Sequence, residues 1–194
     1  MKHPSNRELF NYWNERRGER LAPERADIEP AAIRHVLGDT FVIEMCGSEN
    51  HMFRIAGTRL CALFGRELKA ESFTGLWQRS GHNAIRELIA VVMDEKVGVV
   101  ASVTGATSDD LLAPVQLEML LLPLVSQSPT EARVLGALAP MAAPYWLGAK
   151  AIGPLTLGMF RHIGAVTDTA TPRFKAASGR LKYGLTVYDG GRTV

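Results

Sequence analysis

The imidazole and thiol side chains of this sequence, which could ligate a metal or a haem iron, are five histidines and two cysteines. Haem iron needs an axial ligand, often histidine, and the candidates are His35, His51, His82 and His162. His82 is the best placed, because it opens the clearest predicted helix, at 82–95. It also lies off the apolar stripe of that helix, so an exposed first-turn position is favoured over haem ligation.

Cys46 and Cys61 form no CxxC pair and no cluster with histidine at ligand spacing. Isolated cysteines of this kind are most often buried thiols in a reducing compartment. We therefore predict no metal site, and the sequence leaves any cofactor unknown.

Hydrolytic and nucleotide chemistry find little support. The candidate serine nucleophiles, none in a GxSxG context, are Ser72, Ser80, Ser102 and Ser108. Asp109 and Asp110 are adjacent, and two carboxylates without further spaced ligands are more typical of a solvated loop than of a cation site. GAKAIG (148–153) matches neither a P-loop nor a dinucleotide fingerprint. We predict that the protein is not an enzyme.

The charge and hydropathy patterns predict no nucleic-acid partner and no membrane association. The net charge is only +2, and Arg16, Arg17 and Arg20 alternate with Glu15 and Glu19 instead of forming a basic patch. The apolar run at 119–125 is far shorter than the roughly 20 residues of a membrane span. The N-terminus has no apolar signal region, so we expect a cytoplasmic protein.

Two strands, at 41–46 and 52–56, are predicted to form a hairpin around the turn GSEN. Alternation places Phe41, Ile43 and Met45 on one face, and Phe53 and Ile55 inward on the second strand.

Residues 53–77 follow as a glycine-broken stretch rich in large apolar side chains, and then comes the amphipathic helix 82–95. Strands at 97–104, 114–124 and 132–140 are joined by polar links, which predicts an antiparallel meander. The order of elements predicts an α+β fold with one sheet.

An N-terminal helix is predicted at 5–17, with Ser5 and Glu8 as a capping box. Its apolar stripe consists of Leu9, Phe10 and Trp13. The stripe either docks on its own domain or forms a homodimer contact, and we expect a homodimer through these residues. A polar connector, 18–30, leads to a short helix at 31–37, which Gly38 is predicted to close in a left-handed conformation.

Residues 141–194 contain several prolines and glycines within an apolar segment. They are predicted to form a loop-rich arm on the domain or on a partner, with a late strand within 181–191. The predicted organisation is an N-terminal helix at 1–20, a sensor domain at 21–140 and the arm at 141–194.

Three phrases resemble PAS domains, and in particular a family of stand-alone bacterial PAS-domain proteins. They are LAPERADIEPAAIRHVL, FRIAGTRLCALFGRELKAESFTGLW and the YDGGR at 188–192. The resemblance covers about residues 20–140 and implies a five-stranded antiparallel sheet of order 2-1-5-4-3, with short helices and one longer helix over one face. It also implies a ligand pocket between that face and the helices, and signalling through an unknown partner protein. Cys61 lacks the NCRFLQ context of flavin-binding photoreceptor PAS domains, so flavin photochemistry is not expected.

The predicted pocket lining is apolar and comes from the helical face of this fold. Trp77 is the favoured lining residue because its indole N–H needs a polar partner when buried. Arg59 and Arg66 could offer charge to an anionic ligand, although exposure is the simpler reading. The full predicted ligand-binding set is Phe53, Ile55, Leu60, Phe64, Phe73, Trp77, Ile85, Ile89, Met119 and Leu138.

Two functions are predicted. The first is a cytoplasmic sensor that binds a small ligand and signals through a partner. The alternative is a ligand-free interaction or dimerisation adaptor. All these apolar residues would also serve in a filled core, and the sensor is the function that we favour from the sequence.

Overall fold

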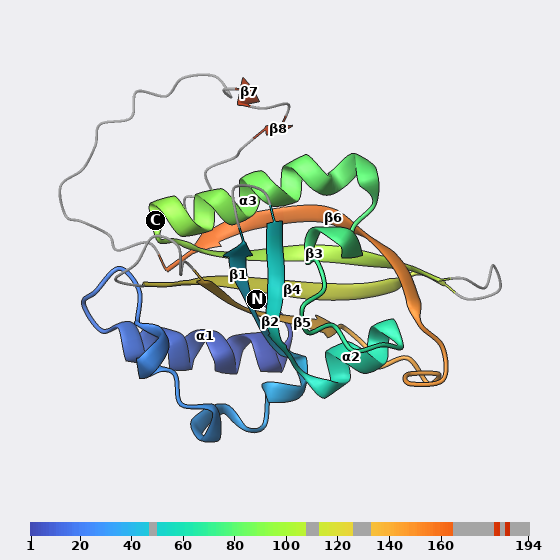
Figure 1. The fold of residues 1–194 in the computed structure, drawn as a ribbon, viewed down its shortest axis with the longest axis horizontal. Coiled ribbons are helices and arrows are strands. Elements are labelled where there is room, and N and C mark those ends of the chain that lie inside the picture. Colours follow the sequence, from blue (N-terminus) through green and yellow to red (C-terminus); the bar gives the residue numbers. More distant parts are fainter. Residues whose placement is uncertain (47–49, 108–112, 126–132, 165–180, 183–184, 187–194) are drawn as a thin grey trace, which may run out of the picture.

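One six-stranded antiparallel sheet forms the centre of the protein, with helices on both faces (Figure 1). The computed structural model describes residues 1–46, 50–107, 113–125, 133–164, 181–182 and 185–186. The strand order is β2-β1-β5-β4-β3-β6. The strands are β1 (Thr40–Cys46), β2 (Asn50–Ala56), β3 (Gly98–Thr107), β4 (Val115–Leu124), β5 (Arg133–Pro140) and β6 (Ile152–Ile163).

The α-helices are α1 (Pro4–Arg17), α2 (Thr58–Phe64) and α3 (His82–Glu95). Short 3-10 turns connect them: η1 (Arg25–Asp27), η2 (Pro30–Ile33), η3 (Leu37–Asp39), η4 (Thr74–Leu76) and η5 (Arg79–Gly81). Two short strands, β7 (Leu181–Lys182) and β8 (Leu185–Thr186), pair with each other within the predicted late strand. The YDGGR phrase lies outside the described residues. Among the described helices, none is long and apolar enough to cross a membrane.

The predicted α+β, PAS-like fold is confirmed, and its five strands stand in the predicted order. The arm at 141–194 was predicted to be loop-rich. This prediction was wrong at 152–163, where the chain forms β6 and pairs with β3 along most of its length. Pro154 is tolerated because β6 is an edge strand and its pairing shifts register between Gly105 and Thr107. Gly158 lets β6 approach β3 closely, since a Cβ there would lie 2.5 Å from Ser102 Oγ.

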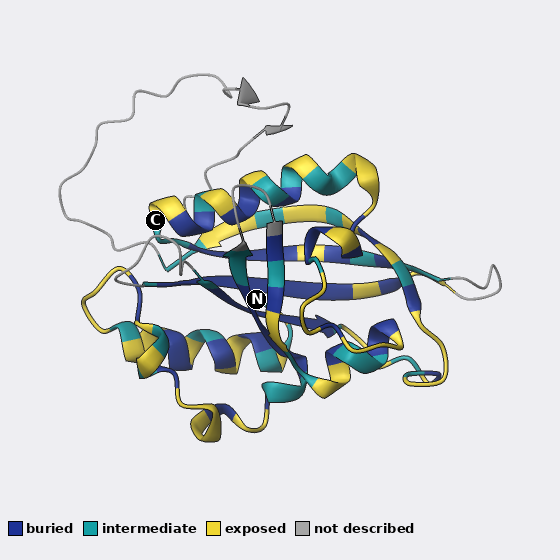
Figure 2. Ribbon diagram, viewed as in Figure 1, coloured by how far each residue is buried: buried dark blue, intermediate teal, exposed yellow. Residues whose placement is uncertain are grey.

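The central strands β4 and β5 are buried on both faces (Figure 2), and their sequences are accordingly apolar almost without interruption. On β4, Leu117, Met119 and Leu121 face α3, whereas Leu120 and Leu122 face α1. The helix α3 packs its predicted stripe on the first of these faces.

The helix α1 docks on the sheet of its own chain. Leu9 and Trp13 are fully buried there, and Trp13 Nε1 donates to the Pro123 carbonyl at 2.9 Å. Phe10 is half-buried and is the one member of the predicted stripe with exposed surface. The homodimer stays a prediction, and in this fold Leu9 and Trp13 contribute to the chain's own core.

The predicted capping box at the start of α1 was wrong. His3 is the N-cap residue, and its ring Nδ1 accepts from the Ser5 backbone N–H at 3.2 Å. The Ser5 hydroxyl instead donates to Asp39 at 2.7 Å, which connects the helix to η3. Pro4 explains the earlier start, because a proline suits the first turn of a helix.

The predicted helix at 31–37 was also wrong, because the chain forms 3-10 turns there. Ile33 ends η2 and Val36 precedes η3, both are buried, and the Val36 N–H donates to the Ile33 carbonyl at 3.0 Å. Gly38 is not left-handed. It instead allows close packing, since a Cβ there would lie 2.9 Å from Arg59 Cζ.

Candidate functional site

Residues 70–78, here called the crossing segment, connect the two edges of the sheet over the α3 face. At one end the segment runs beside β2, where Phe53 N donates to Glu71 O at 2.9 Å and Phe73 N donates to His51 O at 2.8 Å. At the other end it reaches β6, where Gln78 N donates to Leu155 O at 2.9 Å. The segment therefore covers the face on which the pocket was predicted.

This connection requires a strongly curved sheet. Gln78 comes five positions after Phe73, and a stretch of this length spans at most about 18 Å. In a flat sheet, the five gaps between β2 and β6 would span about 24 Å. The sheet must therefore curl so that its two edges approach each other, and the concave side is closed by the crossing segment and α3.

Aromatic rings fill the space beneath the crossing segment. Phe41, Phe53 and Phe73 form a mutual cluster with ring centroids 5.4–5.6 Å apart. Trp77 extends the cluster, with its ring 5.9 Å from that of Phe73. These tilted and edge-on arrangements are the ones that aromatic pairs prefer.

Nine of the ten predicted ligand-binding residues lie together in this core. They share one buried apolar cluster, and they are Phe53, Leu60, Phe64, Phe73, Trp77, Ile85, Ile89, Met119 and Leu138. Their placement is as predicted, but a contact with ligand stays a prediction, since a filled core would use the same residues.

Ile55 was predicted to face the same side and does not. It is 47% exposed. The pairing of β1 with β2 aligns Val42 with Ile55 and Ile43 with Phe53, so Arg54 is an extra residue in β2. This β-bulge breaks the alternation and turns Phe53 and Ile55 to opposite faces of the sheet.

Several polar atoms are buried around the crossing segment without a hydrogen-bond partner in the described part of the chain. They are Trp77 Nε1, Thr74 Oγ1, His51 Nδ1 and Arg86 Nε. Thr74 and Trp77 belong to the crossing segment itself, His51 lies on β2 beside it, and Arg86 projects from α3. Such groups are rare in a folded protein, and each calls for a physical explanation.

An electrostatic interaction links His51 on β2 with Arg86 on α3. Burial lowers the pKa of His51 below its usual 6.5, and the positive charge of Arg86 lowers it further. His51 is therefore neutral at physiological pH. A neutral imidazole and a guanidinium together can donate hydrogen bonds without repelling each other.

Two of the other candidates, His82 and Cys61, form hydrogen bonds within the chain. His82 Nε2 is hydrogen-bonded to the Trp77 carbonyl at 3.0 Å, so it positions the crossing segment against α3. Burial raises the pKa of the Cys61 thiol, and the nearby Glu67 carboxylate adds to this, so the thiol stays protonated. No group of three His, Cys, Asp or Glu side chains within the described residues could hold a metal ion. Asp109 and Asp110 lie outside those residues.

The two arginines considered for an anionic ligand are paired with carboxylates. Arg59 binds Asp39 with two nitrogens, both at 2.7 Å, and this hydrogen bonding raises the pKa of Arg59. Arg66 lies 3.5 Å from Glu71. Their charges are thus compensated within the chain.

Sequence reasoning did not single out Thr74 or Arg86, and it considered His51 only as a haem ligand and not as part of this site. For His51 a signal existed, because it lies two residues before Phe53 and alternation would place it on the same face had the strand been extended to residue 50. Arg86 lies off the apolar stripe of α3, and periodicity indicates the direction of a side chain but not the burial of one atom along it.

A family model described as a PAS domain matches residues 1–139, a range that includes α1, β1 to β4 and all but the last residue of β5. Among curated proteins no match is found.

Proposed function

The chain belongs to the PAS domain family, and on this premise we propose that it is a signal-sensing protein that binds a small ligand between the crossing segment and α3. The proposed ligand is held on the curled face of the sheet, and its presence is passed to a partner protein. The proposal is one of binding and not of catalysis.

The observation that carries the proposal is the set of buried polar atoms without partners at Trp77, Thr74, His51 and Arg86. An unsatisfied buried donor costs about 1–3 kcal/mol, so several such groups on the crossing segment and the elements beside it favour an additional group that accepts their hydrogen bonds. The indole N–H and the guanidinium N–H can only donate, and the threonine hydroxyl can donate as well. A carbonyl or carboxylate oxygen is the complementary chemistry.

A second candidate function is the ligand-free adaptor, and one observation favours it. The nine predicted lining residues are at most 6% exposed and belong to a single cluster. A core packed in this way needs no ligand to be stable. The two functions differ in one respect: the sensor requires that a ligand form hydrogen bonds with the buried unpaired atoms, and the adaptor does not.

Native mass spectrometry of the purified protein tests the proposal. We expect a retained small molecule, or a raised melting temperature with a panel of aliphatic and aromatic carboxylic acids. Trp77→Phe keeps the ring and removes the indole donor, so it should reduce retention by about tenfold. Trp146→Phe is the matched control, because Trp146 is also buried (8% exposed, against 3% for Trp77) but lies outside the crossing segment.

Absence of both a retained mass and a thermal shift would reject the ligand proposal and favour the adaptor. If Trp77→Phe and Trp146→Phe retained the ligand equally, the ligand would bind outside the space between the crossing segment and α3. Thr74→Val is a second variant that should behave like Trp77→Phe, since it also removes a polar atom without changing the side-chain volume much.

A further inference from the structure

A cavity of ≈ 360 Å³ lies on the face of the sheet opposite to the crossing segment. The segment that contains η1, η2 and η3 forms one wall of the cavity, and β1, β2 and β5 contribute to the other. Its apolar surface comes from residues that include Ile28, Ile33, Val42, Ile55 and Leu135. The cavity is thus separated by the sheet from the site proposed above.

Local geometry explains why this space is not filled. The bulge at Arg54 directs Ile55 to this face, where it stays 47% exposed. Short 3-10 turns cover the face here, and they present fewer side chains to the sheet than a continuous helix would. A large β-branched side chain is therefore left beside an open volume.

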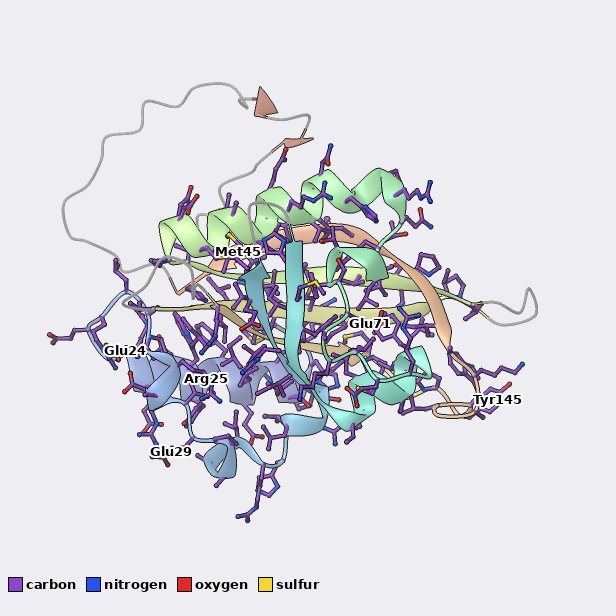
Figure 3. The ribbon with its side chains drawn as sticks, in the orientation of Figure 1. Glu24, Arg25, Glu29, Met45, Glu71 and Tyr145 are labelled. Atoms are coloured by element: carbon purple, nitrogen blue, oxygen red, sulfur yellow. The ribbon has the colours of Figure 1, made fainter. Side chains whose placement is uncertain are left out.

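Arg25 is the charged residue of the cavity wall. One of its nitrogens, Nη1, donates to the Ile28 carbonyl at 3.1 Å, which leaves further guanidinium N–H groups for another partner. The neighbouring carboxylate Asp27 is paired with Arg20 at 2.8 Å. Glu24 and Glu29 are exposed on the same segment (Figure 3), and neither forms an ion pair with Arg25 in the described structure.

We propose that this cavity binds a small amphipathic molecule with an apolar body and one carboxylate. The body lies against Val42 and Ile55, and the carboxylate pairs with the Arg25 guanidinium. The volume is at the lower end of the roughly 300–1,000 Å³ typical of ligand sites, which fits a medium-length fatty acid or a small aromatic acid. An arginine is suited to this role because its planar N–H groups match the two oxygens of a carboxylate.

Decanoate is a suitable probe, with decanol as its uncharged counterpart, and binding is followed by amide chemical shifts in ¹H–¹⁵N NMR spectra. We expect saturable binding of one decanoate, with the largest shifts at residues 25–42 and 55–58. Arg25→Gln should weaken decanoate binding by about tenfold or more and leave decanol binding unchanged. Arg34→Gln is the matched control, because Arg34 is exposed on the same segment and does not line the cavity.

Ile55→Trp supplies a second variant, since a larger side chain at this half-exposed position fills the cavity and should abolish the binding of both probes. Shifts centred on residues 70–93, or binding that does not saturate, would overturn the proposal. Equal decanoate affinity in wild type and Arg25→Gln would also overturn it. Trp77→Phe should bind decanoate normally, so failure of the ligand site under the crossing segment is distinguishable from failure of this one.

Discussion

Replacing Glu118 by glutamine should detach the N-terminal helix from the sheet. Glu118 lies on β4 and is only 8% exposed. Its Oε2 accepts from the Lys2 backbone N–H at 2.7 Å, and its Oε1 accepts from the His3 N–H at 3.0 Å and from Asn6 Nδ2 at 3.1 Å. One carboxylate thus satisfies donors at the start of α1 and also faces the positive end of the helix dipole.

The expected loss in the free energy of unfolding follows from these hydrogen bonds. Glutamine keeps one oxygen, so at least one of the three donors meets an amide N–H₂ and loses its acceptor. A hydrogen bond to a charged group contributes about 1.5–3 kcal/mol, and loss of the charge at the helix N-terminus adds about 0.3–1 kcal/mol. Glu118→Gln should therefore lower the free energy of unfolding by about 2–4 kcal/mol, a large part of the roughly 5–15 kcal/mol of a typical domain.

Urea unfolding followed by tryptophan fluorescence and by far-UV circular dichroism measures this change. Native-state hydrogen exchange adds a local readout, because the amides of α1 should lose protection before those of β3 to β5. The matched control is Glu87→Gln, an exposed carboxylate on α3, whose effect should stay within about 0.5 kcal/mol.

A loss of less than about 0.5 kcal/mol in Glu118→Gln would refute the reasoning. Unchanged hydrogen-exchange protection of the α1 amides in Glu118→Gln would also refute it. Either result would mean that the apolar contacts of Leu9 and Trp13 hold the helix without the carboxylate.

Gly136→Ala should destabilise the fold by about 1–3 kcal/mol, because a Cβ there would lie 2.3 Å from Phe41 Cζ across the β5–β1 pair. Gly81→Ala, where a Cβ meets nothing within 4 Å, is the control, and equal urea midpoints for the two variants would contradict the packing argument. His51, whose pKa is lowered by burial, should make stability fall as the pH drops below 6.5, since the unfolded chain binds a proton that the folded chain does not. His51→Gln should flatten this dependence between about pH 7 and 5, and an unchanged slope would count against a buried neutral imidazole.

Much of the fold is readable from local pattern. Helix α3 was predicted from the spacing of Ile85, Leu88, Ile89 and Val92, all of which are buried. The strands β1 to β5 were predicted from alternation and turn composition, and their order came from the family resemblance. Nine of the ten predicted lining residues lie in one buried cluster. The periodicity of apolar residues made this predictable, because it indicates which side of each helix or strand is buried.

Local pattern failed where a long-range contact outweighs propensity. Pro154 and Gly158 read as breaks, yet the edge position of β6 and its contact with Ser102 accommodate both. Ser5 read as a capping residue, but it is bonded to Asp39, 34 positions away in sequence.

The sequence by itself determined five strands of the sheet, the main helix, the family resemblance and the identity of most buried apolar side chains, because these depend on residue type and on spacing within each element. Only the tertiary structure decided which polar atoms are left without partners, since that depends on where β2, the crossing segment and α3 meet. It also decided that Ile55 belongs to the opposite face, because a single extra residue in β2 reverses the alternation that every sequence-based assignment of a strand assumes.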